Sequence, residues 1–337
     1  MKKLIPAVLL LALVLTSCSS LRAEKTADFF AMDTYMSVKY YGGPDGESEK
    51  LETAAAELEK KLSVTKEDSE IARLNRDGRA KLSGETEKLL TGALDLCRET
   101  EGALDVTVYP AVRAWGFTTG EHRVPDKDEI DGIVGKIGYG NVTAGGGEAA
   151  LPDGYMVDLG AVAKGYLGDK LAEILKEDGV TSALLDLGGN IRAVGEKPDG
   201  APWRVAVRDP AGEGVIGTLP LRDETAATSG GYERYFVDED GEIRWHIIDP
   251  ATGYPAKAGL ISVTVIGKDG LRCDGLSTAL FVMGREKSVS FWRERRGFEM
   301  ILVTDDGKIL ISPGLSGVFE PEKGSAYSVE VVGNDQD

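Results

Sequence analysis

Histidine and cysteine are scarce in this chain of 337 residues, which holds His122, His246, Cys18, Cys97 and Cys273 and no other residue of either type. Two histidines are too few for a multi-histidine metal site, and the cysteine spacing contains no C-x-x-C pair for a thiolate zinc site. A Ser-His-Asp triad stays possible, but it would have to use one of the two histidines. A bound metal is therefore expected to be a hard ion with oxygen ligands, Mg²⁺ or Ca²⁺.

Positive charge is also in short supply, with 39 Lys and Arg against 56 Asp and Glu, a net charge of −17. This balance excludes a nucleic-acid-binding protein, because phosphate backbones require clustered positive charge. The chain lacks a P-loop and has no convincing G-x-G-x-x-G after a strand, so the common nucleotide-binding motifs are absent as well. The hydrophobic fraction of 42% is that of a globular protein.

A long hydrophobic run occurs only at the N-terminus, where Lys2 and Lys3 precede the apolar stretch from Leu4 to Leu15. This pattern predicts a secretory signal peptide over residues 1–17, and the ending Leu-Thr-Ser-Cys resembles a bacterial lipobox with Cys18 as the lipidated residue. We expect a polar tether over 18–27 and an extracytoplasmic protein, anchored by lipid to the bacterial cell membrane on its periplasmic side or at the cell surface. The alternative is a plain signal peptide with an incidental cysteine.

The other two cysteines are expected to be buried free thiols, since cysteine often packs as a small hydrophobic residue. Cys97 lies in a helical pattern and Cys273 lies next to a candidate site motif. A disulfide between them is the alternative in an oxidising compartment.

The periodicity predicts an α+β fold in which helices flank antiparallel sheets. One catalytic unit over 28–320 with a C-terminal tail over 321–337 is the simplest division. Helices are expected over 47–62, 83–99, 126–136, 162–176, 275–283 and 286–296, with a helical turn over 69–75. Strands are expected over 29–41, 156–159, 182–187 and 260–266, with several antiparallel strands between 202 and 249 and short strands after 296.

The segment from Asp158 to Gly165 (DLGAVAKG) predicts a strand that turns through glycine into a helix. The free N–H groups of such a helix start suit an anion, Lys164 could hold a phosphate, and Asp158 could accept from a ligand hydroxyl or N–H. A tight turn with a solvated lysine explains the same residues equally well.

A second candidate lies at Cys273-Asp274-Gly275-Leu276-Ser277-Thr278. Asp274 and Thr278 are four residues apart, so on a helix their oxygens share a face and form a partial Mg²⁺ site. An aspartate that caps a helix is the more common reason for such a sequence.

The third candidate is His246, which ends a predicted strand just before the turn at Pro250 and Gly253. A histidine near a turn is a candidate general base, because its ordinary pKa lies near neutrality. A histidine that only bonds a neighbour on the strand is the alternative.

Taken in order, eight blocks of the chain resemble the ApbE family, the FAD:protein FMN transferases, over about residues 28–315. The resemblance implies a T-fold-related architecture and an enzyme that cleaves FAD with Mg²⁺, transfers FMN to a Thr or Ser hydroxyl of an extracytoplasmic protein and releases AMP. The blocks are 32–34, 69–75, 103–107, 158–165, 186–190, 227–230, 246–253 and 274–278.

Carried over motif by motif, the resemblance also assigns site residues. The FAD site would be lined by Met32, Ala103, Leu104, Asp105, Asp158, Lys164 and Ile248. The metal would be held by Asp274, Thr278 and the backbone carbonyl of Ala161, with Ser277 close by. His246 and Asp274 are the candidate bases for the acceptor hydroxyl.

The expected partners are FAD and a redox membrane-complex subunit that carries an Asp-Gly-x-Ser-Gly-Ala-Thr sequence. The segment from Asp274 to Leu280 resembles that acceptor sequence, but Leu280 stands where the accepting hydroxyl would be. The chain is therefore expected to be the donor enzyme. A Mg²⁺-dependent FAD pyrophosphatase and a non-catalytic FAD-binding lipoprotein are the competing functions.

Overall fold

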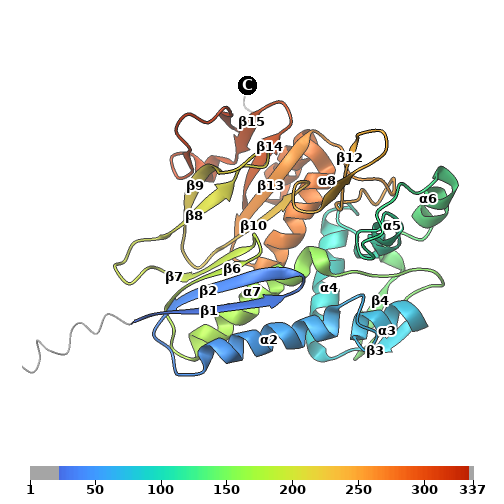
Figure 1. Ribbon diagram of the computed structural model, residues 1–337, viewed down its shortest axis with the longest axis horizontal. Coiled ribbons are helices and arrows are strands. Elements are labelled where there is room, and N and C mark those ends of the chain that lie inside the picture. The colour runs from blue at the N-terminus through green and yellow to red at the C-terminus, as the bar shows by residue number, and fades with distance from the viewer. Residues whose placement is uncertain (1–22, 334–337) are drawn as a thin grey trace, which may run out of the picture.

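A nine-stranded sheet forms the centre of the protein in this computed structural model, which describes residues 23–333 (Figure 1). Its strands pair antiparallel throughout, except that the last one, β17, runs parallel to β15. The order across the sheet is β1 (Glu24–Ala31), β2 (Thr34–Tyr41), β6 (Ser182–Leu187), β7 (Ile191–Gly195), β10 (Thr225–Gly230), β13 (Leu260–Gly267), β14 (Glu299–Thr304), β15 (Lys308–Ile311) and β17 (Ser328–Val331).

The middle of the sheet is buried on both faces. Along β14, Met300 and Leu302 point into the main hydrophobic core, whereas Ile301 and Val303 point into a second core on the other face. A small sheet of β8 (Trp203–Arg208), β9 (Val215–Leu221) and β16 (Glu320–Pro321) supplies much of that second core. Burial on both faces explains why β14 is a continuous apolar run without alternation.

Helices cover the main-core face of the sheet, and the α+β fold is confirmed (Figure 1). They are α2 (Glu47–Leu62), α3 (Glu70–Asp77), α4 (Gly84–Glu99), α7 (Gly160–Glu177) and α8 (Gly270–Arg295). Two expected helices, 275–283 and 286–296, form the two parts of α8, which is interrupted at Gly284 with φ 76° and ψ 179°. The first part begins at Gly270 because Asp269 caps it by accepting from the amide of Arg272.

To one side of the molecule lie α5 (Tyr109–Ala114) and α6 (Lys127–Val134) (Figure 1), whose apolar residues take part in a third, smaller core. It contains Trp115, Phe117, Ile130 and Ile248. A hairpin of β11 (Tyr235–Val237) and β12 (Ile243–Trp245) packs against it. Three short strands, β3 (Arg79–Lys81), β4 (Thr143–Gly145) and β5 (Glu148–Ala150), form a separate small sheet, and η1 (Val106–Val108), η2 (Tyr139–Asn141) and η3 (Pro313–Leu315) are single 3-10 turns.

Both edges of the large sheet differ from the expected boundaries. The first strand begins at Glu24, so part of the segment expected as a tether belongs to the sheet. The segment expected as a C-terminal tail contains β17, which pairs with β15. Edge strands gain much of their stability from backbone hydrogen bonds, and a mostly polar sequence conceals that contribution.

The strand expected over 156–159 is absent. This stretch is extended, but the side-chain amide of Asn75 takes the place of a neighbouring strand: it donates to the carbonyl of Val157 at 2.8 Å and accepts from the amide of Val157 at 2.7 Å. The amide of Asp158 donates to the carbonyl of Val106 at 2.9 Å. The prediction of a strand here was wrong, because these residues bond the Asn75 side chain and the 3-10 turn at Val106 instead of a neighbouring strand.

Cys97 and Cys273 are buried free thiols, as expected, and burial raises the pKa of Cys97 to about 12. Cys18 and the predicted signal peptide lie outside the described residues. Within residues 23–333, no helix has both the length and the apolar character needed to cross a membrane.

Candidate active site

The candidate site begins where α7 and α8 cross at two glycines. A Cβ added to Gly165 would lie 2.0 Å from the carbonyl oxygen of Gly270, and one added to Gly270 would lie 2.3 Å from that of Gly165. Such distances are far below van der Waals contact, so only glycine allows the two backbones to approach this closely. The crossing brings Asp274, one turn further along α8, against the first turns of α7.

Asp274 is almost fully buried, with 3% of its surface exposed. Its Oδ2 accepts from the amide of Gly165 at 2.8 Å. Burial raises the pKa of this carboxyl, whereas the charge of Lys164 lowers it. In a regular helix the Gly165 amide donates to the carbonyl of Ala161, four residues earlier. Its bond to Asp274 competes with that helical bond and gives the Ala161 carbonyl capacity for another partner.

Three hydroxyl groups lie next to Asp274. The hydroxyl of Ser277 donates to the carbonyl of Asp274 at 2.7 Å and is 2.7 Å from the hydroxyl of Ser229 on β10. The same Ser229 oxygen is 3.1 Å from Oγ1 of Thr278. The spacing of Asp274 and Thr278 thus places both on one side of α8, as the sequence predicted, and β10 adds a hydroxyl to the group.

Asn190 completes this cluster from the turn between β6 and β7. Only 2% of its surface is exposed, and neither its amide nitrogen nor its amide oxygen has a hydrogen-bond partner within the described chain. The amide nevertheless faces the Asp274 carboxyl, and hydrogen bonding toward it lowers the pKa of that carboxyl, so the contact is longer than a normal hydrogen bond. A buried, unpartnered polar side chain is costly, so it points to a missing ligand.

Oxygen donors dominate the cluster: a carboxylate, three hydroxyls and an amide. These donors suit Mg²⁺, which takes few protein carboxylates and completes its shell with water and phosphate oxygens. No group of three or more His, Cys, Asp or Glu side chains arranged for a metal occurs within residues 23–333. The residues present therefore fit a hard ion held by one carboxylate and neutral oxygens.

Lys164 lies at the electrostatic centre of the site. Its charge lowers the pKa of Asp158, Glu233 and Asp274, while burial is the main cause that raises the pKa of each. The carboxylate of Asp158 accepts from the amide of Gly160 at 2.9 Å, so it fixes the start of α7. The charge of Lys164 thus acts on carboxyl groups from three separate segments of the chain, which suits a site for an anionic ligand.

His246 joins the site from the end of the β11–β12 hairpin. Its backbone amide donates to the carbonyl of Arg234 at 3.0 Å, and its Nδ1 lies 3.2 Å from that same oxygen. A carbonyl only accepts, so Nδ1 carries the proton and Nε2 keeps its lone pair. Burial and the neighbouring charges of Arg234 and Lys164 lower the pKa of His246 to about 4. A neutral imidazole with a free Nε2 is the state that a general base requires.

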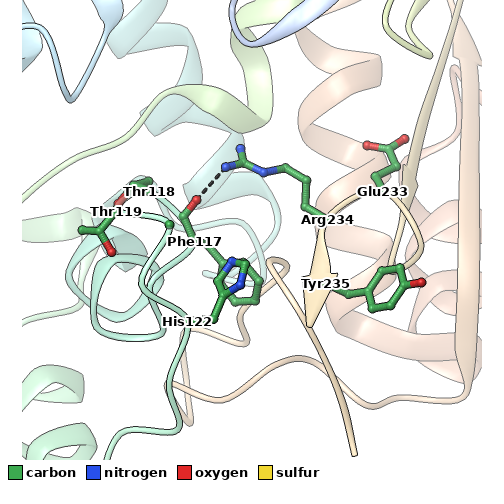
Figure 2. A pocket seen from close by; sticks show the side chains of 8 residues that line it. Phe117, Thr118, Thr119, His122, Glu233, Arg234 and Tyr235 are labelled. Atoms are coloured by element: carbon green, nitrogen blue, oxygen red, sulfur yellow. Dashed lines mark hydrogen bonds between the residues drawn. The ribbon is translucent and has the colours of Figure 1, made fainter. Parts of the chain in front are cut away.

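A cavity of about 450 Å³ opens between this hairpin and the loop after α5 (Figure 2). Arg234 crosses it and donates to the carbonyl of Phe117 at 2.6 Å. The volume is that of a site for a cofactor-sized molecule. Its lining consists of Phe117, Thr118, Thr119, Gly120, His122, Glu233, Arg234 and Tyr235.

Met32 lies in the turn between β1 and β2, with φ of 51°, and its amide donates to Glu59 at 3.1 Å. The turn reaches the rest of the site through Thr34, whose Oγ1 would lie 2.2 Å from a Cβ on Gly188. Gly188 belongs to the same β6–β7 turn as Asn190. The β1–β2 turn that holds Met32, an expected FAD-site residue, therefore neighbours the turn that supplies Asn190.

The expected FAD-site residues at 103–105 and Ile248 serve the protein interior with their side chains. Both oxygens of Asp105 are used, Oδ1 by Thr107 and Oδ2 by the amide of Tyr139 at 3.0 Å. Leu104 packs against α8 at Gly275, Ala103 packs against the main core, and Ile248 is in the third core. These side chains therefore pack in the protein interior next to α8 and in the third core.

Sequence reasoning assigned no role to Asn190, Ser229, Glu233 or Arg234. Asn190 and Ser229 lie in the segments 186–190 and 227–230, which carry the family resemblance. Polar side chains at the ends of apolar strands were the feature that could have identified them as site residues. Glu233 and Arg234 lie outside every block, and only the folded hairpin brings them to Lys164.

Solved structures share this fold. An ApbE protein from Thermotoga maritima superposes with a TM-score of 0.82 at 33% identity, covering 89% of this chain and 100% of that one. The flavinyl transferase ApbE of Pseudomonas stutzeri, in its apo form, gives a TM-score of 0.80 at 30% identity, covering 89% and 98%. The architecture is therefore that of an α+β protein class to which flavin transferases belong.

The family model described as the ApbE family matches residues 32–302. The FAD:protein FMN transferase of Haemophilus influenzae is 34% identical over 333 residues, which span 91% of this chain and 95% of that protein. The protein of the same name from Treponema pallidum is 33% identical over 288 residues, 79% of each chain. The chain belongs to the ApbE family.

Proposed function

We propose that this protein is an enzyme that transfers FMN from FAD to a threonine or serine hydroxyl of another protein and releases AMP. The observation that carries the proposal is the oxygen cluster at the crossing of α7 and α8, where the buried Asn190 has no protein partner next to Asp274. The relatives' names supply the reaction, and the site supplies groups suited to a pyrophosphate and its metal.

Mg²⁺ would be held by Asp274, Thr278 and the carbonyl of Ala161, with Ser277 and Ser229 supporting Thr278 and Asp274 by hydrogen bonds. When bound, the ion neutralises charge on the pyrophosphate and makes AMP a better leaving group. Lys164 and Arg234 bind and orient the phosphates. The cavity beside Arg234 accepts part of the dinucleotide, because its volume of about 450 Å³ suits a group of that size.

The acceptor hydroxyl attacks the phosphorus of the FMN half, and its proton must go to a base. His246 fits this role, since its Nε2 is unprotonated well below neutral pH and its Nδ1 is fixed by the Arg234 carbonyl. Asp274 is the second candidate that the sequence offered. Its oxygen is already bonded to Gly165 and its carboxyl faces the metal cluster, so the geometry favours His246.

The decisive experiment uses the full chain with FAD, MgCl₂ and the peptide Asp-Gly-Leu-Ser-Gly-Ala-Thr. We expect a peptide mass gain equal to FMN with equimolar AMP, abolished by EDTA and by Asp274→Ala. Glu286→Ala, an exposed acid on the same helix, is the matched control and keeps full activity. AMP and free FMN without labelled peptide would instead establish an FAD pyrophosphatase, and neither product would leave a flavin-binding protein.

We also propose that lipid on Cys18 anchors the enzyme to the extracytoplasmic face of a bacterial membrane. The support is the signal-peptide pattern of residues 1–17 and the lipobox-like residues before Cys18. Intact mass of the membrane-extracted protein should show a diacylglyceryl-modified N-terminal cysteine. Cys18→Ala should release the protein from the membrane fraction, and retention of that variant would contradict the anchor.

A further inference from the structure

The two helices that cross at Gly165 and Gly270 carry the same short pattern. In α7 the glycine is followed by Asp169 one turn later, and in α8 it is followed by Asp274 one turn later. The structure pairs the two patterns reciprocally, because the amide of Gly165 donates to Asp274 at 2.8 Å. In turn, the amide of Gly270 donates to Oδ2 of Asp169 at 2.7 Å. Each helix therefore supplies one glycine amide and one carboxylate to the other.

The two hydrogen bonds differ in what they demand of their helix. Gly165 lies inside α7, so its bond to Asp274 competes with a bond within the helix. Gly270 is the first residue of α8, and the amides of a first turn have no partner within their own helix. Asp169 therefore caps α8 from a second helix, in addition to the cap that Asp269 provides. The Asp169 bond fixes the start of α8 and breaks no bond elsewhere.

The charge of Asp169 is balanced by Arg192 of β7. The Nη1 of this arginine lies 3.6 Å from Oδ1 of Asp169, and only 9% of the arginine surface is exposed. The same Nη1 donates to the carbonyl of Lys268 at 2.7 Å and to the hydroxyl of Thr225 on β10 at 3.2 Å. Its stem contacts α7 at Gly168. One rigid guanidinium thus joins α7, the sheet and the segment that leads into α8.

The carboxylate of Asp274 depends on the position of this helix start. Gly270 and Asp274 are one turn apart on α8, so a shift at the start of α8 moves the carboxylate as well. It would then move relative to the amide of Gly165 and to Asn190 on the β6–β7 turn. Mg²⁺ demands near-ideal octahedral geometry, so a small displacement of the carboxylate that holds it weakens its binding.

We propose that Asp169 is a positioning residue, which sets where the Asp274 carboxylate lies in the candidate metal cluster by holding the amide of Gly270. Arg192 keeps Asp169 in place for this role. The role rests on the proposed function, in which the cluster holds the metal of the reaction. Asp169 bonds the start of α8 and belongs to no part of the cluster, so its effect on the metal passes through Asp274.

The test compares Asp169→Ala with Asp169→Asn, which keeps an oxygen that can accept from the Gly270 amide. We expect Asp169→Ala to raise the Kd for Mg²⁺ in calorimetry about tenfold, the loss typical when a group that orients a metal ligand is removed. Asp169→Asn should restore the Kd to within about twofold of wild type. Activity is not needed for this measurement.

A second readout needs no metal. An amide proton that is donated to a carboxylate makes a short, strong bond, and its NMR signal lies downfield. In the metal-free protein, the Gly165 amide proton should move upfield in Asp169→Ala and keep its position in Asp169→Asn. The double variant Asp169→Ala, Arg192→Met removes the pair without leaving a buried charge, so it should fold and show the same two changes as Asp169→Ala.

Leu175→Ala is the matched control, because Leu175 is fully buried near the other end of α7. It should lower stability and change neither the Kd for Mg²⁺ nor the Gly165 signal, which separates positioning from general destabilisation. An unchanged Kd and Gly165 signal in the double variant would overturn the role of Asp169 and leave the proposed transferase intact. Equal losses in Asp169→Ala and Asp169→Asn would also overturn it. Wild-type protein that binds no Mg²⁺ would refute the proposed metal cluster, and this role with it.

Discussion

The amide of Gly165 on α7 donates to Oδ2 of Asp274 on α8 at 2.8 Å, across a helix crossing where neither Gly165 nor Gly270 has room for a side chain. Packing and chemistry meet in this one bond. The close approach of the two helices brings the Asp274 carboxylate next to α7. The carboxylate then accepts a hydrogen bond from an amide that would otherwise donate within α7.

Gly165→Ala should destabilise the protein and weaken Mg²⁺ binding together. The added Cβ would lie 2.0 Å from the Gly270 oxygen and 2.7 Å from Cβ of Asp274, so the helices must separate, at about 1–3 kcal/mol of unfolding free energy. Urea unfolding and Mg²⁺ calorimetry measure the two effects. Gly132→Ala on α6, where a Cβ meets nothing within 4 Å, should instead gain about 0.5–1 kcal/mol. Unchanged stability of Gly165→Ala would contradict the crossing.

Asn190→Leu should preserve the stability of the metal-free protein and abolish its stabilisation by Mg²⁺. The amide makes no hydrogen bond of normal length in the described chain, so the relief of a poorly satisfied polar group, about 1–3 kcal/mol, offsets the loss of its weak interaction with Asp274. Thermal unfolding with and without MgCl₂ gives the answer. Ser182→Ala, which removes another buried hydroxyl without a partner, should keep the Mg²⁺-induced shift. A full shift in Asn190→Leu would exclude Asn190 from the metal cluster.

His246 should remain neutral to an unusually low pH. Burial, Arg234 and Lys164 lower its pKa from 6.5 to about 4, so its ring signals in an NMR titration should not move between pH 8 and 5.5. The nitrogen shifts should report a proton on Nδ1. The unfolded chain binds this proton near pH 6.5, so the contribution of His246 to stability is lost as pH falls from about 6.5 through 4. A midpoint near 6.5 in the folded protein would contradict the prediction.

Glu47 should make stability fall as pH rises toward 7. Burial and the neighbouring Asp178 raise its pKa to about 7, against the opposing charges of Lys50 and Lys25. The folded state keeps a proton on Glu47 that the unfolded state releases near pH 4.5. The contribution of this group to the unfolding free energy is therefore fully present below pH 4.5 and is lost as the pH rises through about 7. The unfolding free energy of Glu47→Gln, taken relative to wild type, should be about 1–3 kcal/mol larger at pH 8 than at pH 5. Glu52→Gln, on the exposed side of α2, should show no such dependence.

Sequence reasoning predicted the helices well because their periodic apolar pattern extends over several turns. It predicted the central strands well because they are short apolar runs rich in β-branched residues. Ser83 caps α4 as expected, the helix expected from Asp126 is present as α6, and the pair Asp274 and Thr278 shares a helix face. It failed at β17 and at 156–159, where short segments are held by an edge pairing and by the Asn75 side chain.

The metal cluster was only half visible in the sequence. Spacing along one helix reveals Asp274, Ser277 and Thr278. Ser229 and Asn190 come from other strands, and their distance from Asp274 depends on sheet order and on the glycine crossing, which no local pattern records. Arg234 was missed for the same reason, since it reaches Lys164 and the cavity only through the hairpin.

The placement of α8 imposes an order on assembly. Lys164 and Asn190 are synthesised before Asp274, which lies 110 and 84 residues further along the chain. Its helix docks on β10 and β13, and it contacts α7 through two glycines. A chain that is still being made, or one cut short before Asp274, has Lys164 without the carboxylate that completes the cluster. The candidate cluster is therefore complete only after α8 has been synthesised and has docked on β10 and β13.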